Sequence, residues 1–583
     1  MKKKHVKKMM ALLLTAAMFS MVACGNQENK ESQVNATSSS TESAQVSTDG
    51  AKEESKVVKQ EDLPVITYYS SSADLPSGIQ KGHRGELFAE RGFQLEVWAY
   101  SPEKTTAMIA SGDLPDIMLV PKANIDVMIE EGMLLNLEEY LDDIPHLNEN
   151  EFTEVALQNV RDNFSGGTGS VYGLPASVGV AGTSMGLNSP TDRRCLKLNW
   201  EAYEKIGAPD IKDAWHLLDV MEEMVAAQPE VEGEKTWGTC ITSGSDSKYF
   251  ASMQGFHYWH GYGVEYLAYL LEADYANEAV YSILEDDSLY HEGLKWYNEA
   301  YRRGLLDPDS ISAERATMLQ KTESGMVMVP GANFLGPSPI YLEYLLPDTS
   351  ILNVPTNPKG STNFLIAINA DTEHLEECLA YLDVISNPDD VMSLIYGKDG
   401  DGIWYSDGDV FCLTDRFVEY VKENGSYTGY LFDSGEEYSL YNTSKFINTG
   451  NPISLTTEDG EPVPNNLQYS KAYQSIIMGP KFSAWQETMG YNDWIELLED
   501  KNALTNGSSV YGLASYFEAM DEKMKLTMDS IKDTVVNASW QMVYAESEEE
   551  FDKIWTKMVS DCKGLGAQEL IDWTIKNIEN LTK

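Results

Sequence analysis

The chain has 583 residues, of which 92 are Asp or Glu and 43 are Lys or Arg, so its formal net charge is −49. A field of that sign repels nucleic acid and anionic lipid head groups, which excludes functions that depend on a positive surface. The chain is also longer than one hydrophobic core normally serves, which predicts two lobes.

A cationic and apolar leader ends at Cys24. Lysines gather in residues 2–8, an apolar run occupies residues 9–21, and the small residue Ala23 precedes the cysteine. This order is typical of bacterial lipoprotein signals, and the apolar run is too short for a permanent membrane helix. We expect residues 1–23 to be a removable signal peptide, and a lipid on Cys24 to hold the mature protein on the outer face of the membrane. An ordinary secretory signal with a chance cysteine is the alternative.

The segment that follows the signal peptide is rich in Ser, Thr, Glu, Asn, Gln and Lys and has almost no large apolar residue. Such a segment cannot bury enough apolar surface to fold. We therefore expect residues 24–61 to be a lipidated, disordered tether.

Five further cysteines are far apart in the sequence and odd in number: Cys195, Cys240, Cys378, Cys412 and Cys562. Their spacing predicts neither a disulfide framework nor a zinc motif. We expect most of them to be small buried apolar residues.

Strand and helix patterns alternate after the tether. Apolar, β-rich runs predict strands at residues 65–69, 94–98 and 117–120. Each is followed by a predicted helix, at residues 86–91, 105–111 and 125–131 respectively, and Ser101 is placed to cap the second helix. Continuous apolar strands in this order predict a parallel sheet with helices on both faces. Ligands of such sheets bind beyond the carboxyl ends of the strands.

The rest of the chain predicts a second lobe and a return to the first. Further helices are predicted at residues 200–206, 215–227, 290–303 and 373–385, a strand at residues 364–368, and two closing helices that begin with a capping box of Ser547 and Glu550. Crossings between lobes are placed after a short strand at residues 171–175 and at residues 354–355. The predicted first lobe is therefore residues 62–176 with 355–395, and the second is residues 177–354 with 396–583.

Seven motifs occur in a fixed order: residues 110–117 (ASGDLPDI), 131–137 (EGMLLNL), 172–175 (YGLP), 199–209 (NWEAYEKIGAP), 294–310 (LKWYNEAYRRGLLDPDS), 324–329 (SGMVMV) and 551–566. Together they resemble family 1 extracellular solute-binding proteins, the carbohydrate receptors of ABC importers, and most of all the long-chain lipoprotein branch. The resemblance covers nearly the whole mature chain. It implies a two-lobed, periplasmic-binding-protein-like α/β fold in which each lobe is a mostly parallel sheet flanked by helices. It also implies a hinge and a ligand between the lobes, and a pair of membrane permeases with an ATPase as partners.

One departure from that branch concerns metal binding. Some members carry an Asp/Asn-rich calcium loop after the helix that corresponds to residues 215–227. Residues 228–234 of this chain are QPEVEGE, which lack the alternating Asp and Asn ligands. We predict no calcium here, and no metal or cofactor elsewhere.

Three patterns could suggest other chemistry. Gly182–Gly186 matches the GxSxG pattern of hydrolases with Ser184 as nucleophile, but Pro190 follows closely and disfavours the helix that such an elbow requires. His257 and His260 lack the further ligands of a zinc site, which favours packing or cleft lining. The segment 399–402, DGDG, lacks the later ligands of a calcium loop and favours a solvated turn.

Aromatic residues are the stronger clue, because the chain has 12 Trp and 32 Tyr. A sugar ring can stack its C–H face on an aromatic ring and hydrogen-bond its hydroxyls to polar neighbours. Trp296 and Trp555 lie in amphipathic helices and are assigned to packing. The cleft candidates lie at strand ends or in loops: Tyr69, Ser71, Ser72, Asp74, Trp98, Tyr100, Asn124, Trp259, His260, Asn333, Phe334, Trp404 and Tyr405.

These observations predict a surface-tethered, monomeric receptor that captures an extracellular carbohydrate, with an oligosaccharide preferred, and delivers it to an ABC permease. No catalytic residue is assigned. A secreted hydrolase or esterase that acts on glycans through Ser184 is one alternative, and a receptor that feeds a signalling partner is another. The sugar's identity, length and charge stay open.

Overall fold

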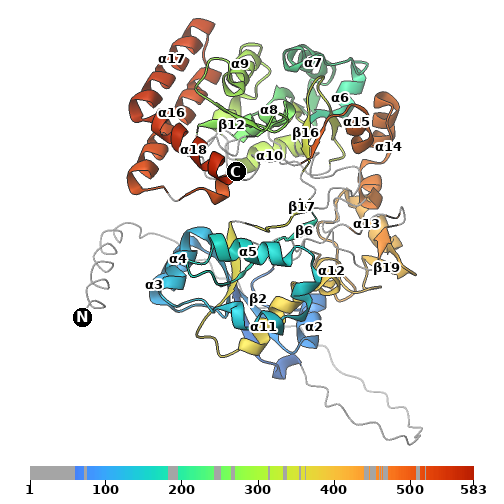
Figure 1. Ribbon diagram of the computed structural model, residues 1–583. Helices are drawn as coiled ribbons and strands as arrows, with labels where there is room; N and C mark the ends of the chain where they lie inside the picture. The colour runs from blue at the N-terminus through green and yellow to red at the C-terminus, as the bar shows by residue number, and fades with distance from the viewer. Residues whose placement is uncertain are drawn as a thin grey trace, which may run out of the picture. The chain divides into compact units, whose positions relative to one another are not determined.

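The computed structural model (Figure 1) describes residues 60–70, 75–180, 195–241, 251–263, 270–312, 315–331, 338–353, 356–361, 363–438, 446, 455–457, 460, 463, 471–506, 513–518 and 520–582. Their buried apolar side chains form two large cores. The first core draws on residues 66–178 and 365–473, and the second on residues 195–352 and 478–578. Both cores are therefore assembled from segments far apart in the sequence, as two lobes require.

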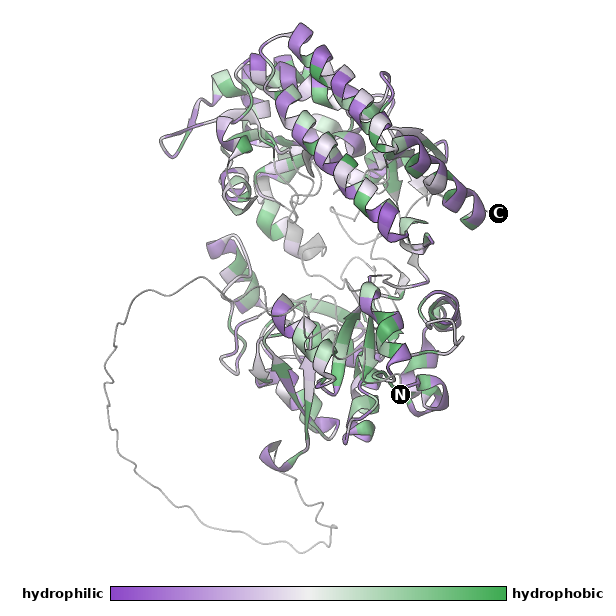
Figure 2. Ribbon diagram, turned by 90° about the vertical axis from the view of Figure 1, so that its left-hand side faces the viewer, coloured by the Kyte–Doolittle hydropathy of each residue, from purple (hydrophilic) through white to green (hydrophobic). Residues whose placement is uncertain are grey.

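A six-stranded sheet organises the first core. Its order is β2 (Gly78–Ile79), β3 (Gln94–Trp98), β1 (Val65–Tyr69), β4 (Ile117–Pro121), β18 (Phe364–Ile368) and β5 (Leu174–Pro175). The three central strands β3, β1 and β4 are parallel, whereas the ladders β2–β3, β4–β18 and β18–β5 are antiparallel. The predicted strands are confirmed, and the sheet is mixed at its two sides rather than parallel throughout. Figure 2 shows hydrophobic strands in this sheet, in line with the sequences IMLVP of β4 and FLIAI of β18.

The antiparallel strands follow from where the chain enters and leaves the sheet. Phe364 starts β18 opposite Pro121, the last residue of β4, so the returning chain enters at the carboxyl edge of the parallel strands. Pro175 ends β5 at the same edge, opposite Leu365. The connection that leaves β5 and the one that returns into β18 therefore both meet the sheet at the edge at which ligands of such sheets bind.

The helices of the first core are α2 (Gly82–Glu90), α3 (Pro102–Ser111), α4 (Lys122–Glu130), α5 (Thr153–Asn163), α11 (Leu375–Val384), α12 (Pro388–Tyr396) and α13 (Asp415–Asn424). Ser101 caps α3 as predicted, because its side chain accepts a hydrogen bond from the Lys104 N–H at 3.1 Å. Gly112 ends that helix in the left-handed region at φ 75°. The caps thus fix where α3 begins and ends.

A small sheet also packs on the first core. It consists of β19 (Trp404–Asp407), β20 (Val410–Leu413) and β21 (Thr456–Thr457). The core includes Trp404, Phe411 and Tyr473, so the described part of residues 403–473 packs with the first lobe, whereas the sequence predicted the second. The lobe boundaries themselves stay a prediction.

The second core is mostly helical. Its helices are α6 (Trp200–Lys205), α7 (Ala214–Ala227), α8 (Ala251–Trp259), α9 (Leu289–Arg302), α10 (Arg315–Glu323), α14 (Lys471–Met489), α15 (Trp494–Asp500), α16 (Glu522–Val543), α17 (Glu548–Leu565) and α18 (Ala567–Leu581). Its parallel strand pairs are β10 (Trp237–Thr239) with β14 (Val327–Val329) and β16 (Ile351–Asn353) with β22 (Leu504–Asn506). Its antiparallel groups are β7 (Leu196–Asn199) with β15 (Tyr341–Tyr344), β8 (Glu230–Val231) with β9 (Glu234–Lys235), and β11 (Tyr262–Gly263) with β12 (Leu271–Asp274) and β13 (Ala279–Ser282).

Among the closing helices, α16 packs on α9, and α17 and α18 pack on α16 (Figure 1, red and green). The Asn298 side-chain amide donates to the carbonyl oxygens of Met542, Val543 and Ala545 at 2.8 to 3.1 Å. One buried amide on α9 therefore fastens the carboxyl end of α16 and the residues that follow it to α9. All five cysteines beyond Cys24 are buried, and none of them forms a disulfide.

By the core membership of the described residues, the chain passes between the two cores at three places. Two of them lie side by side, because β6 (Gly179–Val180) pairs antiparallel with β17 (Thr356–Asn357). The third lies within α14, where Tyr473 belongs to the first core and Met478 to the second. Gly479 breaks the helical geometry there with φ 41° and ψ −124°. The sequence analysis predicted the third crossing at residues 395–396 instead. No helix in the described ranges is both long enough and apolar enough to cross a membrane.

Asp116 holds the sheet together at the end opposite the crossings. Its carboxylate accepts from the Thr67 N–H at 2.8 Å, the Thr67 hydroxyl at 2.6 Å and the Thr372 hydroxyl at 2.6 Å. Burial raises the pKa of Asp116, but the hydrogen bonds from Thr372 and Thr67 outweigh it and hold the pKa below its usual value. The ionised carboxylate thus links β1, β4 and the turn after β18.

Replacing Asp116 with Asn should therefore destabilise the first lobe by about 2 kcal/mol at neutral pH, because an amide cannot accept all three bonds. A carboxyl whose folded pKa is depressed contributes its stability above the unfolded pKa of about 3.9, and loses it as the pH falls through the folded value. The difference in unfolding free energy between the two proteins should shrink below about pH 4 in urea titrations. The exposed neighbour Asp113→Asn is the control, and a difference that does not change with pH would contradict this role.

Candidate functional site

The carboxyl edge of the first-lobe sheet brings three of the predicted residues together. Tyr69 ends β1 and Trp98 ends β3, and the two residues are paired in the parallel ladder. Tyr100 follows two residues after Trp98, and its ring centroid lies 5.8 Å from that of Tyr69. We call Tyr69, Trp98, Tyr100 and the neighbouring Lys104 the aromatic platform.

The platform has a buried base and an exposed top. Tyr69 is 1% exposed, and its hydroxyl contacts the Ser101 carbonyl oxygen at 2.9 Å and the Thr105 hydroxyl at 2.7 Å. Tyr100 is 48% exposed, and Trp98 is half-buried. Because Tyr69 is fastened to the first turn of α3, the exposed Tyr100 ring stands on a fixed support.

Lys104 completes the platform, and the sequence analysis missed it. Its ammonium lies 4.5 Å from the Trp98 ring centroid and 5.4 Å from that of Tyr69. Within the ranges that the structure describes, no carboxylate forms an ion pair with it. The sequence signal was a lysine in the first turn of a helix that begins directly after an aromatic strand end. An ammonium group on two aromatic rings supplies hydrogen-bond donors beside an apolar face.

The other candidates of this edge have less structural support. Asn124 is half-buried in the first turn of α4, which starts directly after β4 and so begins at the same edge. Ser71, Ser72 and Asp74 lie outside the described residues. All of them stay predictions.

In the second lobe, Trp259 and His260 are adjacent but differ in environment. Trp259 is 2% exposed and packs between Phe256 and Trp296, with ring centroids 5.8 and 5.7 Å away. The His260 Nδ1 lies 2.7 Å from the Phe256 carbonyl oxygen, and burial lowers the pKa of His260, which favours a neutral ring at pH 7. The remaining candidates of this lobe, Asn333 and Phe334, lie outside the described residues.

Trp404 and Tyr405 are neighbours on β19 with opposite exposures. The Trp404 indole N–H donates to the Gly397 carbonyl oxygen at 3.1 Å, and its ring stacks on Phe411 within the first core. Tyr405 is 44% exposed. Trp404 is therefore a core residue in this structure, whereas the Tyr405 ring is available to solvent.

The structure shows the surroundings of two of the three patterns that could suggest other chemistry. The third, Gly182–Gly186, lies outside the described residues. His257 is buried, and its Nε2 lies 2.8 Å from a carboxylate oxygen of Glu272. That carboxylate also accepts from the Leu289 and Tyr290 N–H groups at the start of α9. Asp399 accepts a hydrogen bond from the Ser406 N–H at 2.9 Å, so its segment is a turn that supports β19. No group of three metal-ligating side chains occurs in the described part of the chain.

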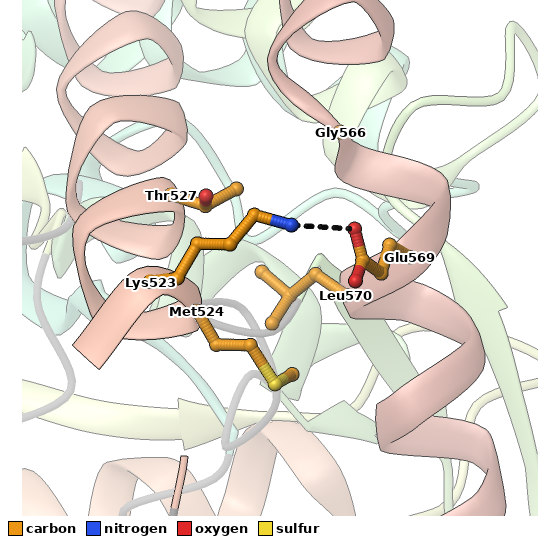
Figure 3. Close-up of a pocket in the computed structure, with 6 residues that line it drawn as sticks. All are labelled: Lys523, Met524, Thr527, Gly566, Glu569 and Leu570. Carbon is orange, nitrogen blue, oxygen red and sulfur yellow. Dashed lines mark ion pairs between the residues drawn. The ribbon is translucent and has the colours of Figure 1, made fainter. Parts of the chain in front are cut away.

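A small cavity lies between α16 and α18 (Figure 3). Lys523 and Glu569 form an ion pair of 3.8 Å across it, beside Leu570. Its volume of about 10 Å³ is roughly that of one water molecule. It is therefore too small for a solute.

Solved structures with a similar fold cover nearly the whole chain. An HMO-binding, ABC-transporter-associated solute-binding protein of Bifidobacterium longum infantis matches 89% of this chain and 99% of its own, at 14% identity and a TM-score of 0.56. The Streptococcus pneumoniae ABC-transporter substrate-binding protein FusA, solved with kestose, matches 88% and 99% at 15% identity and a TM-score of 0.56. The fold of this chain is therefore that of solute-binding proteins. An N-glycan transport solute-binding protein of Streptococcus pneumoniae matches 89% and 99% at 14% identity and a TM-score of 0.51.

The fold that the sequence resemblance implied is thus confirmed, and the three proteins are binding proteins rather than enzymes.

No family model matches the chain. A curated protein from Niallia circulans, an uncharacterized protein in the butB 5′ region, is 24% identical over 162 residues. That match spans 26% of this chain and 61% of the curated protein, which is itself uncharacterized, so it indicates no function for this chain.

The support beneath Tyr100 can be tested with Tyr69→Phe. This change keeps the ring but removes the hydroxyl contacts with Ser101 and Thr105, which should cost about 1 kcal/mol of stability. Backbone amides in the first turn of α3 should then exchange with deuterium faster than in the wild-type protein. Tyr281→Phe, at an exposed ring of the second lobe, is the control and should change neither quantity. Unchanged exchange in α3 would show that the hydroxyl does not hold this turn.

Proposed function

We propose that this protein is the extracellular solute-binding component of an ABC importer, and that it captures an oligosaccharide on the aromatic platform. The observation that carries the proposal is the position of the platform. It lies at the sheet edge from which the chain crosses to the second lobe, in a fold shared with solute-binding proteins over 89% of the chain. Solved proteins of this fold include an HMO-binding protein and one in complex with kestose, which supports a saccharide ligand.

The platform suits a sugar ring because it offers two kinds of contact. The exposed Tyr100 ring can stack on the C–H face of a sugar, and the Lys104 ammonium can donate to its hydroxyls. Closure of the second lobe over the bound sugar would remove water from both contacts and stabilise the closed form. Binding and release change no covalent bond, which agrees with a receptor rather than an enzyme.

The partners follow from this role. A permease pair with its ATPase would recognise the closed, loaded form, and the receptor would act as a monomer. His260 and the exposed Tyr405 are further proposed contacts, together with Asn124 and the predicted residues outside the described ranges. Trp259 and Trp404 would act from beneath, because both rings are buried.

The binding role can be tested with a panel of neutral and acidic oligosaccharides. A true ligand at 100 times its dissociation constant should add roughly 2.7 kcal/mol of stability and raise the melting temperature. Tyr100→Ala should weaken binding about tenfold, since it removes the exposed stacking face. Tyr281→Ala removes a similarly exposed ring of the second lobe and should have no effect. If peptides or other solutes raise the melting temperature and no glycan does, the substrate class is wrong.

We also propose that the mature protein is held at the membrane by a lipid on Cys24. The sequence of the leader supports this proposal. Cys24→Ser should abolish incorporation of labelled palmitate in bacterial cells and release the protein into the medium, whereas Cys412→Ser should leave both unchanged. A wild-type protein without any label would rule the lipid out.

A further inference from the structure

The other residues of the aromatic platform do not neutralise the charge of Lys104. Its ammonium lies 4.5 Å from the Trp98 ring centroid and 5.4 Å from that of Tyr69. An aromatic face attracts a cation but carries no net negative charge. Within the described part of the chain, no carboxylate forms an ion pair with Lys104. Among the described residues, the platform therefore presents a cation that has aromatic support and no counter-ion.

Other basic side chains of the first lobe are paired. Arg91 lies 2.6 Å from the Asp390 carboxylate, and Arg161 lies 2.8 Å from the Glu138 carboxylate. In a chain with 92 acidic and 43 basic residues, partners for such pairs are abundant. The lack of one beside Lys104 in the described ranges is therefore a feature of this sheet edge and does not reflect a shortage of acids.

The stability of α3 does not account for the lysine either. Lys104 lies in the first turn of this helix, whose N-cap is Ser101. The partial positive charge at the start of a helix favours an acidic side chain, such as the exposed neighbour Glu103, and disfavours a lysine. The ammonium and the helix end thus act in the same direction, because both attract an anion.

A second lysine lies at the same edge. Lys122 begins α4 directly after β4, and its ammonium lies 5.3 Å from the Phe164 ring centroid. Strands β3 and β4 are both parallel to β1 and lie on either side of it, so α3 and α4 start at one edge of the sheet. The charge of Asp126, further along α4, acts on Lys122. Lys104, for which no such partner is described, is therefore the stronger anchor for an anion.

Closure of the lobes makes a counter-ion important. Lys104 is already half-buried, and its ammonium would lose further water when a bound sugar and the second lobe cover the platform. An unpaired charge costs far more to desolvate than a neutral hydroxyl, and a negative partner offsets that cost. The net charge of the chain opposes an anionic ligand mainly at long range, because salt screens it beyond about 8 Å.

We infer that Lys104 selects a saccharide that carries an anionic group, either a carboxylate or a sulfate ester, beside the ring that stacks on Tyr100. The inference rests on the proposed capture of a sugar and names the charge of that sugar. Lys104 determines the specificity of the site, whereas Tyr100 supplies a contact that neutral and acidic sugars share.

Calorimetric titration of the whole protein at about 0.15 M salt tests the inference with matched pairs of oligosaccharides. Trigalacturonate with its methyl ester and 3′-sialyllactose with lactose test a carboxylate, and lactose 6′-sulfate with lactose tests a sulfate. We expect at least one acidic member to bind at least tenfold more tightly than its uncharged counterpart. The pair that shows this preference identifies the anionic group.

Lys104→Met should weaken binding of that acidic member at least tenfold and change the affinity for its uncharged counterpart less than twofold. Lys104→Arg should keep the preference. Lys525→Met, at an exposed lysine near the start of α16, is the control and should alter neither affinity. Tyr100→Ala should weaken both members of the pair by a similar factor. Unaltered thermal melting of the variants establishes that they fold.

Two results would overturn the inference and leave the capture of a sugar standing. They are equal binding of the two members of every pair, and a preference for the acidic member that persists in Lys104→Met. If no oligosaccharide of these pairs or of the wider glycan panel binds, the capture of a sugar is itself wrong, and the inference falls with it.

Discussion

The parallel register of β1 with β3 is the constraint on which the candidate site depends. Because both strands run in one direction, Tyr69 and Trp98 end side by side at the same edge. The hydroxyl of Tyr69 then holds the first turn of α3 through Ser101 and Thr105, and that turn supplies Lys104. A shift of one residue in this register would move Tyr69 to the other face of the sheet and separate all of these contacts.

Local features of the first lobe could be predicted from the sequence, because each depends on a few neighbouring residues. The strands at residues 65–69, 94–98 and 364–368 have the predicted ends, and Ser101 caps α3 as expected. The direction of β18 could not be predicted in the same way. It depends on the chain returning from the second lobe at the carboxyl edge, which is a property of the whole topology. The third crossing was predicted at residues 395–396 and lies inside α14 for a similar reason, because contacts distant in the sequence decide that residues 403–473 pack on the first core.

The candidate site was partly predictable, and its aromatic residues show the limit. The proximity of Tyr69, Trp98 and Tyr100 could be predicted, because the carboxyl ends of parallel strands lie at the same edge of a sheet. Trp404 and Trp259 have the same local appearance in the sequence as cleft residues, yet both rings are buried. Trp404 stacks on Phe411, seven positions further along the chain, across a hairpin of the first core. The sequence does not distinguish a core aromatic residue from an exposed one, because burial depends on which distant residues pack against the ring.

Charge acts on this molecule at two length scales. The net charge of −49 governs what approaches from a distance, whereas screening limits each charge to about 8 Å at physiological salt. At this short range, the Lys104 ammonium lies over the Tyr69 and Trp98 rings of the platform, and no ion pair in the described ranges neutralises it. An acidic composition therefore sets solubility and the rate of encounter, while single side chains decide which ligand each site accepts.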